Sequence, residues 1–176
     1  QLTFPTDHGN LAFGPAFGKV GSHLPILAMP DNNAPVIEAL RQVVADSYAL
    51  IGQTHICHWN VRGPGFFSLH NAFEEQYSEL FPAVDEIAER IRALGALAPG
   101  GLGNLAQMAG IGEIAEDASA SDMVQHLQQI NEKLVGTLSK ARDLAAEAGD
   151  SQTEDLMIAR IQVHEKTIWM LKSYLG

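Results

Sequence analysis

The residues best suited to chemistry in this sequence are two histidines and three carboxylates that recur at helical spacing. His70 and Glu74 are four residues apart, as are Asp85 and Glu89, so on a helix each pair projects from one face. His58 precedes them near the end of an apolar segment. Imidazole and carboxylate ligands without a thiolate suit divalent iron, manganese or zinc, and open positions are what iron–oxygen chemistry needs. We call His70/Glu74 the histidine half-site and Asp85/Glu89 the acidic half-site.

Helical geometry indicates that one chain cannot close this site alone. Glu74 and Asp85 are eleven residues apart, which returns to nearly the same face but separates them by ~16 Å along the helix axis. A second copy packed antiparallel about a two-fold axis near Glu79 and Leu80 would bring each histidine half-site to the acidic half-site of the other chain. Such an isologous contact repeats itself and gives two equivalent sites. His58 could fold over the same pocket.

Each of these residues taken singly has a plainer interpretation. A helical carboxylate is usually just solvated, and a single histidine is more often structural than a ligand. Two such pairs on one face, with a third ligand type at a helix end, favour the metal site. The same doubt applies outside the site: His8 and His23, with Asp7, could bind a further ion, although isolated histidines of this kind usually bind nothing.

The elements that must position the site are predicted to be helices. Residues 1–33 are punctuated by glycine and proline and are expected to form an extended N-terminal tail. Residues 34–176 show helical periodicity and are expected to form one all-α domain, an antiparallel four-helix bundle. The expected helices run from Ala34 to about Val61, from Ser68 to about Leu94, over the short stretch LAQMAG, from Asp117 to Ala148, and from a capping box at Ser151 and Glu154 through Leu175.

Composition restricts the class of protein. The chain has 176 residues, of which 46% are hydrophobic and 18% charged, a balance typical of one globular domain. No run of eighteen apolar residues indicates a membrane span. The net charge of -10 argues against a general nucleic-acid surface. A single cysteine, Cys57, and no basic-then-apolar leader segment favour a cytoplasmic location.

Several segments together resemble a known family. The run HWNVRGPGFFSLH, followed by FEEQYSEL and DEIAERIRALG, is similar to the signature of the Dps family, the miniferritins named as DNA-binding proteins from starved cells. The terminal stretch HEKTIWMLKSYLG is similar to the last helix of that family. The resemblance covers about residues 36–176. It implies a ferritin-like four-helix subunit, with a short helix between the second and third long helices, assembled as a hollow homo-dodecamer.

The resemblance also implies an activity and the residues that perform it. His58 and the histidine half-site would come from one chain and the acidic half-site from its partner, in agreement with the helical geometry. Trp59 matches the tryptophan that family members place beside the centre. The family oxidises ferrous iron, usually preferring hydrogen peroxide to dioxygen, and stores ferric oxide inside the shell. The expected function is therefore a ferroxidase and iron store that protects against oxidative damage.

The sequence departs from the family pattern at three places. Glu74 stands where aspartate is the commoner ligand, and its extra methylene changes its reach. Pro82 lies inside the second helix, where it removes a backbone hydrogen bond and is expected to kink the two-fold contact. The first 33 residues contain one lysine, Lys19, and no arginine, whereas many family members bind DNA through a lysine-rich arm. DNA binding is therefore not expected.

Other functions stay open on the sequence alone. Asp150, Glu154 and Asp155 gather where family members have acidic residues lining pores for iron, but acids at a helix N-terminus also favour the helix dipole. An architectural DNA-compacting protein is one alternative to the ferroxidase. A passive metal-sequestering shell, with zinc in place of iron, is another.

Overall fold

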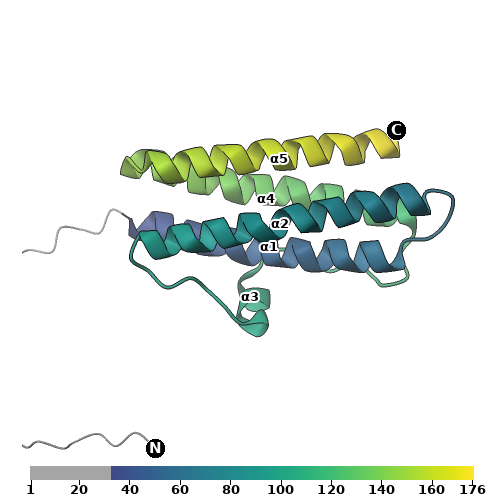
Figure 1. Ribbon diagram of the computed structural model, residues 1–176, viewed down its shortest axis with the longest axis horizontal. Coiled ribbons are helices and arrows are strands. Elements are labelled where there is room, and N and C mark those ends of the chain that lie inside the picture. Colours follow the sequence, from purple (N-terminus) through teal and green to yellow (C-terminus); the bar gives the residue numbers. More distant parts are fainter. Residues whose placement is uncertain (1–32) are drawn as a thin grey trace, which may run out of the picture. The chain divides into compact units, whose positions relative to one another are not determined.

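The part of the chain that the structure describes, residues 33–176, contains five helices and no strand. In this computed structural model the helices are α1 (Ala34–Asn60), α2 (Phe66–Ala93), α3 (Leu102–Met108), α4 (Ala120–Ala148) and α5 (Ser151–Leu175). The four long helices lie side by side as a bundle (Figure 1), which confirms the all-α class and the short helix in the middle of the chain. The predicted tail, with His8 and His23, lies outside the described residues apart from Asn33.

Apolar stripes on the long helices form the core. On α2, Leu69, Phe73, Val84 and Ile91 recur at helical spacing, and each is at most 5% exposed. Matching stripes on α1 and α4 are buried against them, so burial of these side chains supplies the main stabilisation. Cys57 belongs to this core, and burial raises the pKa of its thiol to about 12. It therefore serves as a small apolar residue of the core rather than as a nucleophile.

The connection between α2 and α4 determines the direction of the helices. α1 and α2 are antiparallel neighbours joined by a short turn, and α4 and α5 form a second such pair. The connection that carries α3 runs back along the bundle, so α4 starts at the same end as α2 and runs in the same direction (Figure 1). We call this connection, residues 94–119, the crossover.

Polar side chains of α1 fasten the crossover to the bundle. The buried carboxylate of Asp46 accepts hydrogen bonds from the backbone N–H of Gly110 at 2.8 Å and from the hydroxyl of Thr137 on α4 at 2.9 Å. The Oε1 of Gln53 accepts from the backbone N–H of Ile114 at 2.9 Å and lies 3.1 Å from His126 Nε2. These bonds satisfy backbone groups that the irregular chain would otherwise leave unpaired.

Two helix ends differ from the sequence-based expectation. α4 begins at Ala120 rather than at the expected Asp117, and the hydroxyl of Ser119 caps it by accepting from the backbone N–H of Asp122. The prediction of a capping box at Ser151 is wrong: Asp150 caps α5 and accepts from the backbone N–H of Thr153, and Ser151 is already helical. An ionised aspartate is both a good cap and favourable at the positive end of the helix dipole.

The helix that carries both half-sites passes through a proline without ending. α2 extends on both sides of Pro82, whose missing N–H leaves the helix one backbone hydrogen bond short at this point.

None of the helices within residues 33–176 is long and apolar enough to cross a membrane.

Candidate metal centre

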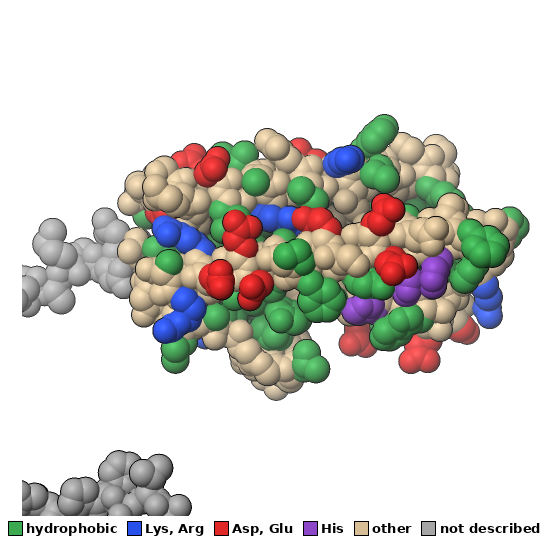
Figure 2. Space-filling view, in the orientation of Figure 1, with side chains coloured by type: hydrophobic (Ala, Val, Ile, Leu, Met, Phe, Trp, Pro, Cys, Tyr) green, Lys and Arg blue, Asp and Glu red, His purple; other side chains and the backbone are tan. Residues whose placement is uncertain are grey.

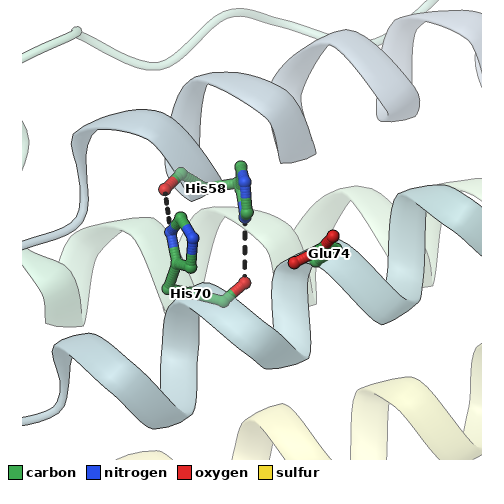
Figure 3. Close-up of side chains that lie close together, drawn as sticks. All are labelled: His58, His70 and Glu74. Atoms are coloured by element: carbon green, nitrogen blue, oxygen red, sulfur yellow. Dashed lines mark hydrogen bonds between the residues drawn. The ribbon is translucent and has the colours of Figure 1, made fainter.

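His58 and His70 meet where α1 ends and α2 begins. The turn between the helices, residues 61–65, is closed by the buried Val61 in an extended conformation and by Gly63, whose φ of 103° favours glycine. The two imidazole rings stack with centroids 3.8 Å apart and planes inclined by 20° (Figure 3). His58 is buried and His70 is partly exposed, so the pair is embedded in the subunit but reached from one side.

Reciprocal hydrogen bonds fix both rings. Nδ1 of His58 lies 2.9 Å from the carbonyl oxygen of His70, and Nδ1 of His70 lies 2.9 Å from the carbonyl oxygen of His58 (Figure 3). Because a carbonyl only accepts, each Nδ1 carries the proton and donates. With the proton of a neutral imidazole on Nδ1, Nε2 carries the free lone pair, which is the arrangement found in metal-binding histidines.

Glu74 completes a group of three potential ligands. Its carboxylate projects from α2 one turn after His70 (Figure 3), and ligand atoms of Glu74, His58 and His70 all lie within 4.8 Å of one another. Two imidazole nitrogens and one carboxylate oxygen suit divalent iron and leave coordination positions open. Glu74 is exposed, so the group of three can be reached from the surface of the subunit.

The acidic half-site is not part of this group. Asp85 and Glu89 are exposed on the same helix, three turns further along, at the ~16 Å that helical rise requires. Figure 2 shows the histidine side chains gathered near the start of α2, with acidic side chains along the rest of this face. Within one subunit the structure therefore brings together His58, His70 and Glu74 and leaves Asp85 and Glu89 apart.

Aromatic side chains form an exposed patch between the two half-sites. His55 stacks on Trp59 with ring centroids 5.0 Å apart and lies 4.3 Å from Tyr77 and 6.1 Å from Phe81. Trp59 is 67% exposed and Phe81 47% exposed, although rings of this size are usually covered when a partner is available. We call His55, Trp59, Tyr77 and Phe81 the aromatic patch.

The aromatic patch was only partly foreseen from the sequence. Trp59 was expected beside the centre through the family resemblance, but its aromatic neighbours were not. Tyr77 stands edge-on to the ring of His58, with ring centroids 5.2 Å apart. The signal was available in the spacing, because His55 and Trp59, like Tyr77 and Phe81, are four residues apart. Burial and the nearby His58 lower the pKa of His55.

Two ion pairs join α2 to α5 on either side of the acidic half-site. Arg160 donates to both carboxylate oxygens of Glu79, and Arg90 donates to Asp150 at 2.7 Å. Burial would raise the pKa of Glu79, but its hydrogen bonds and ion pair with Arg160 outweigh this effect and lower it. The same balance, with Arg90 and Thr153 as the donors, lowers the pKa of Asp150.

The ion pair and the cap also bear on the proposed pore. Asp150 is buried, caps α5 and pairs with Arg90, so its carboxylate already has a structural role. Glu154 is partly buried and Asp155 is exposed in the first turns of α5. A pore lined by these acids stays a prediction.

Comparison with known proteins agrees with this geometry. Residues 37–176 match the family model described as a ferritin-like domain. The chain is 37% identical over 144 residues to DNA protection during starvation protein 2 of Bacillus anthracis, covering 82% of this chain and 99% of the relative.

Solved structures give the same result. The crystal structure of Dps from Staphylococcus aureus matches with a TM-score of 0.78 and 40% identity, covering 80% of this chain and 95% of that one. A Dps protein from Vibrio cholerae, described as a member of a broad superfamily of ferritin-like diiron-carboxylate proteins, matches with a TM-score of 0.80 and 29% identity, covering 90% and 100%.

Proposed function

This chain belongs to the ferritin-like family and, within it, to the Dps proteins, and from that premise we propose that it is a ferroxidase and iron store. Its substrate is ferrous iron, bound between a histidine half-site and the acidic half-site of a second subunit. The oxidant is hydrogen peroxide, with dioxygen as the slower alternative. The product is a ferric mineral held inside a homo-dodecameric shell in the cytoplasm.

The observation that carries this proposal is the fixed pair of histidines beside Glu74. A ligand atom of each histidine and one of Glu74 lie within 4.8 Å of one another, and the hydrogen bonds from Nδ1 leave Nε2 as the nitrogen that can bind a divalent cation. A neutral nitrogen pair with one carboxylate binds ferrous iron without filling its coordination shell. A carboxylate-rich second half would then favour the more highly charged ferric ion.

An isologous dimer supports the rest of the centre. The aromatic patch lies on α1 and α2 between the half-sites, and its Trp59 and Phe81 rings are exposed in the subunit, as the apolar core of an interface would be. An antiparallel copy of α2 across this patch places each acidic half-site against the other chain's His58, His70 and Glu74. Trp59 then borders the centre and helps to exclude water from it.

The proposed reaction balances with peroxide as the electron acceptor. Two ferrous ions lose one electron each, and the two electrons break the O–O bond to give two hydroxide ions. Taking both electrons in one site avoids one-electron cleavage, which would release hydroxyl radical. The residues of the site bind and orient the ions, and the carboxylates offset the increase in charge.

A ferrous titration tests the proposal. Ferrous iron is added without oxygen and peroxide is then supplied, while ferric absorbance and residual peroxide are followed. We expect two ferrous ions to be consumed per peroxide, and we expect His70→Ala with Asp85→Ala to abolish this. The matched control, His126→Ala with Glu86→Ala, removes a histidine and an α2 carboxylate outside the site and should retain the activity. Unchanged oxidation in the first double variant would falsify the site assignment.

The same preparation separates the alternative functions. A passive shell would bind ferrous iron and leave the peroxide unconsumed. A DNA-compacting protein would retard DNA in a gel shift at low salt, where phosphate contacts are strongest. With a net charge of -10, we expect no retardation.

A further inference from the structure

The contact between α2, which carries the acidic half-site, and α5 is poorly supported by apolar packing. Of the helices that pack on one another within residues 33–176, α2 and α5 are the least closely packed pair. A cavity of about 350 Å³ lies between them, lined by side chains that include Leu80, Val163 and Met170. Close packing is what normally fixes the position of a helix in a core, so something else must hold α2 at this distance from α5.

Arginine ion pairs cross this gap. Arg160 on α5 is 7% exposed and donates to both oxygens of Glu79, with Nη2 2.9 Å from Oε2. Arg90 reaches the start of α5, where its Nε donates to the hydroxyl of Thr153 at 2.8 Å and it pairs with Asp150. Arg–carboxylate pairs with two hydrogen bonds fix orientation as well as distance.

Arg160 is itself held from the other side. One of its guanidinium nitrogens lies 3.4 Å from Nε2 of His164, whose Nδ1 lies 2.8 Å from the side-chain oxygen of Asn131 on α4. Asn131 in turn donates to the carbonyl oxygen of Leu127 at 2.7 Å. The guanidinium is therefore connected to α4, the helix that packs most closely on α5.

We infer that Arg160 is a positioning residue for the acidic half-site, acting through Glu79. Asp85 and Glu89 lie between the two ion pairs along α2, and Pro82 leaves that stretch one backbone hydrogen bond short. These ion pairs therefore act together with the packing of α2 on α1 to fix where the two carboxylates stand when the second subunit arrives. The inference rests on the proposed function and adds to it a residue that touches no metal.

The expected effect follows from the precision that a shared centre needs. Displacement of a reacting group by about 1 Å can lower a rate about 100-fold. Removal of residues that orient metal ligands typically lowers metal affinity or activity by about 10-fold to 100-fold. Loss of the ion pair between Arg160 and Glu79 should therefore impair the assembled centre and leave the histidine half-site of each subunit intact.

Three variants of the full chain separate positioning from stability. Arg160→Met removes the tie but leaves Glu79 unpaired, which is destabilising. Glu79→Gln combined with Arg160→Met removes both charges, a change that is often close to neutral for stability. Arg142→Met is the matched control, because its exposed ion pair with Asp143 lies on α4.

Two functional measurements are made on each assembled variant, in addition to thermal unfolding. They are cobalt(II) titration followed by visible absorption, and the rate of ferrous oxidation by peroxide. Thermal unfolding records stability. We expect the double variant to melt close to the wild type, yet to bind cobalt about tenfold more weakly and oxidise iron at least about tenfold more slowly. The Arg142→Met control should match the wild type in all three.

Several outcomes would overturn the inference. A double variant with wild-type stability, cobalt affinity and rate shows that the ion pair is merely structural, while the ferroxidase proposal stands. An equal loss in the control shows an effect that is not specific to α2. If the wild type binds cobalt but does not oxidise iron, the ferroxidase proposal fails and the cobalt titration still decides the role of Arg160. A wild type that binds no cobalt overturns both.

Discussion

The two half-sites lie on one helix but are held in different ways. The histidine half-site is fixed by its neighbours in the chain, through the reciprocal hydrogen bonds of His58 and His70. The acidic half-site is exposed, and its stretch of α2 is tied to the distant α5 through Glu79 and Arg90. The comparison shows that each subunit already holds its two histidines in place, whereas Asp85 and Glu89 are exposed at its surface. In the proposed centre, assembly rather than folding brings them together.

Mixed dimers give the most direct test of whether each site takes its ligands from two subunits. His70→Ala and Asp85→Ala should each abolish ferrous oxidation, because each variant spoils both sites of its dimer. When the two variants are co-expressed in equal amounts, a site is intact only if it takes its histidine from one variant and its aspartate from the other. Random pairing should then restore about a quarter of the wild-type rate. No recovery in verified mixed shells would mean that each site is built within one subunit.

Acid should lower the stability of the protein through His164, the α5 residue beside Arg160. Burial and the charge of Arg160, partly opposed by Glu79, lower the pKa of His164 to about 4. Between about pH 6.5 and pH 4 the unfolded chain holds a proton on this histidine and the folded chain does not. The free energy of unfolding should therefore fall as the pH drops through this window, by up to about 3 kcal/mol.

Denaturant unfolding at pH 7 and pH 4.5, at one protein concentration, measures this loss. His164→Gln has no group that titrates here and should lose this part of the pH dependence. The same pH dependence in the variant and the wild type would assign the effect to other residues.

A charge in the aromatic patch should separate the half-sites of two subunits without unfolding either. Phe81→Lys places an ammonium group where the dimer would bury a ring, and a central interface residue of this kind contributes about 2 kcal/mol or more. We expect dimer dissociation by analytical ultracentrifugation, with helical content unchanged by circular dichroism. Ile158→Lys, at an exposed position of α5, is the control, and equal dissociation in both variants would contradict the assignment of the patch.

The smallest effect is expected from Glu74→Asp. This change shortens the carboxylate by one methylene, while the histidines keep their positions. We expect cobalt affinity to change by less than about tenfold, in a titration of the assembled protein. A loss as large as that of His70→Ala would show that the reach of Glu74 is essential to the site.

The sequence was a good guide to local structure and to faces of helices. The predicted helical period is seen in α2, where Leu69, Phe73, Val84 and Ile91 are buried, and His70 and Glu74 share a face because four residues nearly complete a turn. Helix ends were less predictable, because Asp150 and Ser151 are both good caps and tertiary contacts choose between them. The ion pair of Asp150 with Arg90, 60 residues away, is such a contact.

The contacts that sequence reasoning missed are those between distant helices. Nothing in the local pattern marks Arg160 as the partner of Glu79, 81 residues earlier, or Asn131 as the partner of His164. Such pairs follow from how the crossover places α4 and α5 against α1 and α2. The metal-binding role of the five ligands also stays a prediction, since spacing and geometry indicate only where a cation fits.

The short turn between α1 and α2 has a consequence for the order in which the protein forms. His58 and His70 are 12 residues apart in the chain, so closing their contact costs little chain entropy, whereas the ties of the acidic half-site close loops of 60 and 81 residues. We expect the contact between His58 and His70 to form early in folding, and the ion pairs of Glu79 and Arg90 with the α5 side to form late. A newly made chain would then be able to hold a ferrous ion before it has a second subunit with which to oxidise it.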